Sequence, residues 1–374
     1  MRESDIDRLC TDRGWSRGRL ALELRQAARR TGLTLPADES LKRMIRQWVN
    51  GDRSLSEMYA DLFSLAFGVA FEVASDDDSG DGPDTLAQEL GRVGSALDGE
   101  LVDLFEQQTQ SFRTLDRRLG ARRLLAQTES HVHQMTDLLA FALCGASRSA
   151  LAEAVAEAAA LAGWQALDLG RPDRSWMLHE TAKSAARDSG NPAVIAHVSA
   201  QQAFALLDLD RPRDAVQQVR HARREAAGKV PAVLEAWLWA AEAEALAAAG
   251  AGGTARTALD AAAEAIERSE DDQLAYLFLD GVHLARWRGH CLARVGAGEA
   301  IVELTAALEG LDPSFTRARA GLLVDLAVAH AGRGEQDAAH ARAAEAHALA
   351  EATTSARQKK RILRLLPDGV PLAG

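Results

Sequence analysis

Apolar residues recur at helical spacing along most of the chain. Leu41, Met44, Ile45 and Trp48 stand at positions i, i+3, i+4 and i+7, which predicts a short helix with one buried face. The same periodicity predicts further short helices in the flanking residues 6–28 and 54–68. The amino-terminal part should therefore contain four or five short helices, the third of which exposes a polar face.

That polar face carries three cations and an amide, namely Lys42, Arg43, Arg46 and Gln47. Arginine and lysine can donate hydrogen bonds to guanine in the major groove of DNA, and glutamine can pair with adenine. An ordinary solvated helix shows the same polar face. This helix alone does not decide between the two interpretations.

The surrounding residues resemble the helix-turn-helix of Cro and the phage repressors, the XRE-like type. The matching positions are Trp15-Ser16, Leu20-Ala21, residues 45–51 and residues 53–56. Val49 departs from the motif because an acidic residue is usual there, and residues 26–37 lengthen the connection before the recognition helix. The resemblance implies that double-stranded DNA is a partner of this domain.

The resemblance also implies roles for individual side chains. Lys42, Arg43, Arg46 and Gln47 would face base edges, and Arg17, Asn50 and Arg53 would face phosphates. Residues 1–75 carry a net charge of +1, while the rest of the chain carries −12. A nearly neutral domain with a local basic face can bind DNA, although its non-specific attraction is weaker than that of a basic domain.

The clearest domain boundary is the acidic segment 75–84, SDDDSGDGPD, which cannot bury surface or hold a helix. We expect a helix-turn-helix domain at residues 1–74, a flexible linker at 75–84 and connecting helices at 85–149. Helical repeats with a carboxy-terminal capping helix would fill residues 150–374. The Arg/Lys cluster of that last helix (355–366) is expected to be solvated.

An internal repeat marks the carboxy-terminal part. Residues 167–172 read LDLGRP and residues 207–212 read LDLDRP, with further copies near Gly250, Gly296 and Gly334. About five such helix pairs would stack into an α-solenoid, because one pair cannot bury its own apolar face. Gly163-Trp164, with Gly170 and Ala182 behind, resembles the tetratricopeptide consensus, although the units are longer than that repeat. The expected fold class is therefore all-α.

A stack of this kind leaves a concave groove. The polar and aromatic candidates for its lining are Gln201, Gln202, Glu242, Glu244, Tyr276, His283 and Arg286. The acidic balance of the domain favours a cationic or neutral peptide, or a partner protein, over an acidic ligand. Leu86, Leu90, Val93 and Leu97 form a short seam that could join two copies, so a homodimer is expected.

Composition narrows the function further. There is no GxGxxG, P-loop, HExxH or GxSxG motif, and the three cysteines are far apart. We therefore expect no enzyme, no catalytic residues, no metal and no cofactor. No run of apolar residues approaches the length of a membrane span, and we expect a cytoplasmic protein without a membrane partner.

Taken as a whole, the chain resembles actinobacterial transcriptional regulators that join a repressor-type helix-turn-helix to tetratricopeptide-like repeats. The segment 303–339 is especially typical of their last repeats. The resemblance implies a sequence-specific regulator whose repeat domain binds a peptide, small-molecule or protein signal, or dimerises. The alternative is a protein-interaction scaffold whose helix-turn-helix does not read DNA.

Overall fold

The computed structural model describes residues 6–31, 33, 35–36, 38–49, 55–67, 69, 71, 83–269, 274–277 and 279–365. These residues form helices and no strand, which confirms the all-α fold class. The chain divides into two compact units, Met1–Glu89 and Leu90–Gly374. Across the described ranges no helix has the length and hydrophobicity needed to cross a membrane.

The first unit is a small helical domain with an aromatic core. Its helices are α1 (Ile6–Asp12), α2 (Arg17–Thr31), α3 (Asp38–Val49) and α4 (Glu57–Phe67). Trp48 is 1% exposed, and its ring centroid lies 4.5 Å from that of Tyr59 and 5.6 Å from that of Phe63. Leu41 and Ile45 are also fully buried, as the spacing of α3 predicts.

The connection between α2 and α3 is shorter than the sequence suggested. Helix α2 continues to Thr31 because Ala27 and Ala28 are buried in line with Leu24. Arg25 then fixes the start of α3: its Nε donates to Asp38 at 2.8 Å and its Nη2 donates to the carbonyl of Pro36 at 2.5 Å. The extra residues of segment 26–37 thus lengthen α2 as well as the loop.

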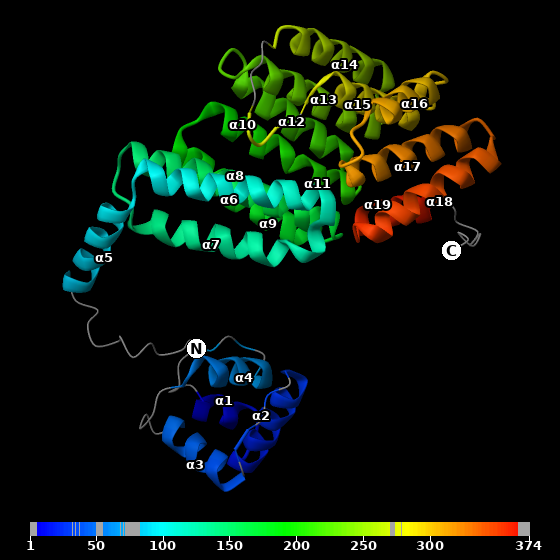
Figure 1. Cartoon of the computed structure of the whole chain (residues 1–374). Coiled ribbons are helices and arrows are strands. Elements are labelled where there is room, and N and C mark those ends of the chain that lie inside the picture. The colour runs from blue at the N-terminus through cyan, green and yellow to red at the C-terminus, as the bar shows by residue number, and fades with distance from the viewer. Residues whose placement is uncertain are drawn as a thin grey trace. The chain divides into compact units, whose positions relative to one another are not determined.

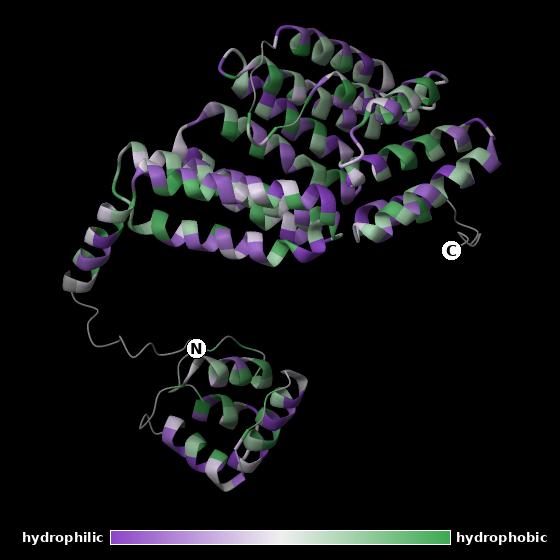
Figure 2. Cartoon of the chain, in the orientation of Figure 1, coloured by the Kyte–Doolittle hydropathy of each residue, from purple (hydrophilic) through white to green (hydrophobic). Residues whose placement is uncertain are grey.

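The second unit consists of antiparallel helices that follow one another in space (Figure 1). It begins within α5 (Pro83–Ala96) and continues with α6 (Gly99–Leu119), the 3-10 turn η2 (Ala121–Arg123), α7 (Leu125–Phe141), α8 (Ala146–Asp168), α9 (Pro172–Ser189), α10 (Pro192–Gln201), α11 (Ala203–Asp208), α12 (Pro212–Ala226), α13 (Ala232–Ala248), α14 (Gly252–Glu267), α15 (Gly281–Arg294), α16 (Ala300–Gly310), α17 (Thr316–Gly332), α18 (Gln336–Ala352) and α19 (Ala356–Leu365). Figure 2 shows hydrophobic and hydrophilic residues alternating along these helices, so that each can bury one side.

One turn recurs in five helix pairs of this unit. Its central residue has a φ between 60° and 78° and is Gly170, Asp210, Gly250, Gly296 or Gly334. The residue after it donates its N–H to the carbonyl five positions earlier, as Arg171 does to Ala166 at 2.9 Å. This pairing closes the end of the first helix of each pair. Glycine adopts such a φ without strain, and Asp210 is of a type that tolerates it.

Helices α6 and α7, expected to connect the two domains, belong to the core of the second unit. Val102 and Phe105 of α6 and Met135 of α7 pack in one cluster with Leu151 and Val155 of α8. The reason is that both helices carry an apolar face that matches the open side of α8. The segment before the repeats is therefore part of the same compact body.

The last helices of this unit return to its first ones. Helix α17 contacts α6, and α19 contacts α8 (Figure 1). Gly120, at the end of α6, lies so close to the backbone of Thr353 that an added Cβ would overlap its carbonyl oxygen. The row of helices thus closes on itself, which gives the unit an interior.

Replacing Trp48 with alanine should lower the stability of the first unit by about 3–5 kcal/mol, because it removes the central ring of a small core. The second unit should melt unchanged, since its core uses none of these residues. Thermal melts followed by circular dichroism test this. Arg43→Ala, on the exposed face of the same helix, is the control and should change stability by less than about 0.5 kcal/mol. Joint loss of both units would contradict the prediction.

Candidate functional site

The outer face of α3 is one candidate site. Arg43 and Arg46 are exposed, and Lys42 and Gln47 are partly exposed, on the side opposite the buried Leu41, Ile45 and Trp48. Because Trp48 is held between the rings of α4, the helix cannot rotate to bury its cations. The face is therefore rigidly presented, which suits contacts that need a fixed register.

The remaining residues implied for DNA contact lie elsewhere. Arg17 is exposed at the first position of α2 and forms an ion pair with Asp7 at 2.9 Å. Asn50 and Arg53 lie outside the described residues. An exposed pair such as Arg17–Asp7 contributes little stability, so phosphate can compete for this arginine at low cost.

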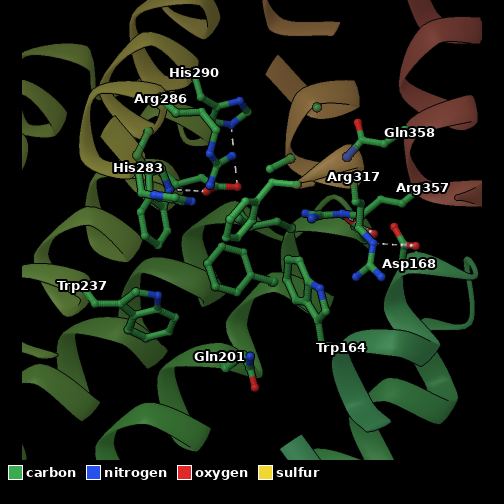
Figure 3. Close-up of a pocket in the computed structure, with 18 of the residues that line it drawn as sticks. Trp164, Asp168, Gln201, Trp237, His283, Arg286, His290, Arg317, Arg357 and Gln358 are labelled. Carbon is green, nitrogen blue, oxygen red and sulfur yellow. Dashed lines mark hydrogen bonds and ion pairs between the residues drawn. The ribbon is translucent and has the colours of Figure 1, made fainter. Parts of the chain in front are cut away.

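The second candidate site is a cavity of about 410 Å³ inside the second unit. Its lining comes from α6, α8, α10, α11, α13, α15, α17 and α19, together with the loop before α15. Figure 3 shows His283, Arg286 and His290 along one side and Arg317, Arg357 and Gln358 along another. Trp164, Gln201 and Trp237 line the side opposite (Figure 3).

Aromatic rings form the apolar part of the cavity. The ring of Phe204 lies 5.9 Å from Trp164, 6.2 Å from Trp237 and 6.4 Å from Trp287, measured between centroids. Trp237 and Trp287 meet edge to face at 6.0 Å. These residues come from successive inner helices, so the repeat itself places large flat rings around the interior.

Buried ion pairs form the opposite wall. Arg317 of α17 is 2.6 Å from Asp116 and 3.3 Å from Asp168, which join it to α6 and α8. Ser355 donates to Asp168 at 2.6 Å. Arg357 of α19 is 3.0 Å from Asp208. Asp168 and Asp208 occupy the same position in LDLGRP and LDLDRP, so the internal repeat supplies two of the acceptors that close the unit.

Burial affects the two sides of the Arg317 pair differently. It raises the pKa of Asp116 above its ordinary value even though Arg317 lowers it. For Arg317, burial lowers the pKa, but Asp116 and Asp168 raise it more. One guanidinium between two carboxylates is a compact charge cluster with little access to water, and it holds its geometry because an unpaired member would be costly.

A cluster of hydrogen-bonded and charged side chains surrounds His290. The Nδ1 of His290 lies 2.7 Å from Asp325, whose Oδ1 also accepts from Arg361 of α19. Glu244 accepts a hydrogen bond from Nε1 of Trp287 at 2.5 Å and lies 3.6 Å from Nε2 of His290. Burial raises the pKa of Asp325, but Arg361 and His290 lower it more, so the pKa falls well below its ordinary value. Burial also raises the pKa of Glu244, but His290 and Arg357 lower it more. Both carboxylates are already engaged.

Arg286 differs from Arg317, Arg357 and Arg361 of the same cavity. Among the described residues it has no hydrogen bond or ion pair, and its Nε is buried without an acceptor. Burial lowers its pKa, while Asp325 and Glu244 raise it. Those two carboxylates attract the guanidinium without binding it.

The structure separates the predicted groove residues into two groups. Gln201, Glu244, Tyr276, His283 and Arg286 line the cavity.

Gln202 and Glu242 do not line it, contrary to the expectation from the sequence. Gln202 accepts from Lys183 at 2.9 Å and from Gln218 at 2.7 Å, and Glu242 lies 2.7 Å from both Arg220 and Arg223. Gln202, between α10 and α11, and Glu242 of α13 both point toward the neighbouring outer helices, because their positions fall on the packed side.

Sequence reasoning missed the arginines of α17 and α19. The cluster of α19 was expected to be solvated, which holds for the exposed Lys360 and Arg364 but not for Arg357 and Arg361, although all four border the cavity. Their spacing of i, i+3, i+4 and i+7 places them on one helix face, opposite the fully buried Ile362. That spacing was a visible signal, but it does not say whether the face meets water or the interior.

Comparison with models of known protein families gives no match, and comparison with curated proteins finds no relative. The interpretation of both sites therefore rests on their residues and geometry.

His197 provides a pH test of the cavity. It is buried between the rings of Trp237 and Tyr276, at 4.8 and 4.7 Å, and burial, with Arg113 and His179, lowers its pKa to about 3. Between pH 6.5 and 3 the unfolded chain binds a proton here that the folded chain does not. Stability should therefore fall as pH decreases through this range, by about 1.4 kcal/mol per unit.

His197→Phe keeps a ring between the same neighbours and should remove that part of the pH dependence. Urea unfolding at pH 6.5 and 4.5 should show a loss smaller than that of the natural chain by about 2–3 kcal/mol. His133→Gln is the control, because His133 is 79% exposed, and should leave the pH dependence unchanged. If His197→Phe lost as much stability between pH 6.5 and 4.5 as the natural chain does, the assignment of this pH dependence to His197 would be refuted.

Proposed function

We propose that this protein is a DNA-binding transcriptional regulator whose first unit reads double-stranded DNA and whose second unit receives a signal. The observation that carries the proposal is the fixed cationic face of α3, with Arg43 and Arg46 exposed and Lys42 and Gln47 beside them. In a helix-turn-helix of the repressor type, such a face enters the major groove.

The assignment of contacts follows from that docking. Lys42, Arg43, Arg46 and Gln47 would meet base edges, and Arg17, Asn50 and Arg53 would meet phosphates. Phosphate contacts set the register and most of the salt dependence, whereas Gln47 and the arginines supply the preference for particular bases.

For the second unit we propose a tetratricopeptide-like stack. The turn that recurs in five helix pairs supports this, since it gives every pair the same closed end. A signal bound inside the stack regulates DNA binding only if its affinity differs between the DNA-competent and DNA-incompetent arrangements. DNA must then change the affinity for the signal by the same factor.

Selection of bound sequences from a random pool of duplex DNA tests the proposal most directly. One enriched motif, and retention on heparin that falls with rising salt, are expected. No enrichment and no retention would favour a protein-interaction scaffold instead.

Gln47→Ala should weaken binding to the selected site by about 1–3 kcal/mol and change binding to random DNA little, because an amide reads a base and not the backbone. Gel-shift titrations on both DNAs measure this. Gln107→Ala, an amide on α6 in the second unit, is the matched control and should change neither. An equal loss on both DNAs would remove Gln47 from the base-reading group.

The protein should form a homodimer that binds an approximately palindromic site, because one recognition helix buries little DNA surface. The seam on α5 offers part of the surface, since Leu86 is 54% exposed while Val93 is buried. Light scattering at micromolar concentration should give twice the chain mass of 40.1 kDa. A monomer that also footprints as a monomer would contradict this, and Leu86→Glu tests whether the seam takes part.

A further inference from the structure

The feature that carries a further inference is the unmatched guanidinium of Arg286. An arginine has five N–H donors, and a buried donor without an acceptor costs free energy. By contrast, Arg113, Arg317, Arg357 and Arg361 of the cavity wall each have a carboxylate within 4 Å. Arg286 lines the same cavity with no partner among the described residues.

Rearrangement inside the unit does not easily supply that partner. The two carboxylates that attract Arg286 are Asp325 and Glu244. Asp325 already accepts from His290 and Arg361, and Glu244 already accepts from Trp287. Moving either carboxylate would leave another buried donor unpaired. Within the described ranges no carboxylate is therefore left to pair with Arg286, which leaves room for an acceptor on a bound ligand.

The cavity beside Arg286 is suited to a flat apolar body. Trp287 is the next residue on α15, and its ring lies against Trp237 and Phe204. The volume of about 410 Å³ is in the range of sites that enclose small organic ligands. Tyr276 adds a second polar group, because its buried hydroxyl has no partner among the described residues.

The local charge favours an anion. Nine Lys/Arg and seven Asp/Glu side chains line the cavity, although residues 76–374 carry a net charge of −12. An extended peptide fits less well, because α17 and α19 are tied to α6 and α8 by Arg317 and Ser355 and would have to separate to admit a long chain.

We propose that the cavity binds a small organic anion, with its carboxylate, sulfonate or phosphate on Arg286 and a flat aromatic body against Trp237 and Trp287. This deepens the proposed function by naming the class of signal. The proposed anion site rests on the proposed function only for the claim that its ligand regulates DNA binding. Binding of a ligand to the cavity itself is measured without DNA.

Two fluorescent probes separate the anionic group from the aromatic body. 8-Anilinonaphthalene-1-sulfonate and N-phenyl-1-naphthylamine share their rings, and only the first carries a charge. Titrated into the full chain, the sulfonate should bind at least about tenfold more tightly, as charged hydrogen bonds of ordinary strength require. Equal affinity of the two probes, or no binding of the sulfonate, would overturn the proposal.

Substitutions then locate the anion. Arg286→Gln should weaken the sulfonate probe at least about tenfold and leave the neutral probe within about a factor of two. Arg286→Lys keeps the charge without the planar donor fork and should lie between Arg286→Gln and the natural chain. Arg288→Gln is the matched control on the same helix: Arg288 pairs with Asp260 outside the cavity, and both probes should be unaffected. A sulfonate affinity unchanged by Arg286→Gln would refute the assignment.

A measurement on the natural chain covers the case in which these variants do not fold. 2-Naphthoate should displace the sulfonate probe, and 2-naphthalenemethanol should not, because only the carboxylate offers Arg286 an anionic acceptor. Equal displacement by both would overturn the proposal. DNA binding measured on the same preparation reports separately on the proposed function, so one can fail while the other stands.

Discussion

The ion pairs of Arg317 with Asp116 and Asp168 are the constraint on which the second unit depends. They connect residues that are about 150 to 200 positions apart and bring α17 against α6 and α8. Removing either carboxylate would leave a buried charge only partly compensated, which typically costs about 3–5 kcal/mol. Without this closure the row of helix pairs would have an open concave side. With it, the same row surrounds a cavity, and α19 turns Arg357 and Arg361 toward its wall.

The closure also explains why buried charges are tolerated in a domain made largely of alanine and leucine. Asp168 and Asp208, each at the end of an inner helix, meet a guanidinium from far along the chain, Arg317 and Arg357 respectively. Asp325, in the middle of α17, meets Arg361 of α19. Pairing lowers the cost of burial for each group, and the geometry of a pair restricts how the helices can slide. The aromatic rings contribute apolar contact without such restriction. The ion pairs therefore mainly set how the helices of the unit are positioned. The aromatic rings provide the surface for a flat ligand.

The sequence predicts much of the local structure. It does not predict that α17 and α19 return to α6 and α8 and close the row of helices. The spacing of Leu41, Ile45 and Trp48 predicts their burial because helical periodicity depends only on neighbouring positions. The recurrence of Gly170 and Gly250 predicts the turn because a positive φ favours glycine. Periodicity says which residues share a helix face, but it does not say what that face meets. Gln202 and Glu242 were therefore assigned to the groove although they bind the outer helices, and Arg357 and Arg361 of α19 were assigned to solvent although they pair with Asp208 and Asp325 at the cavity wall.

Net charge misleads for a related reason. It sums over surfaces that never act together, so an acidic domain can enclose a cavity in which cations outnumber anions. A ligand responds to the groups within a Debye length of about 10 Å or less, and inside a low-dielectric cavity those nearest to it dominate. The same reasoning applies to the first unit, whose net charge is close to zero while α3 presents exposed arginines on one face. For both units the chemistry of recognition is set by which charges the fold brings to one place, and at Arg286 the fold brings a charge to the cavity without an acceptor among the described residues.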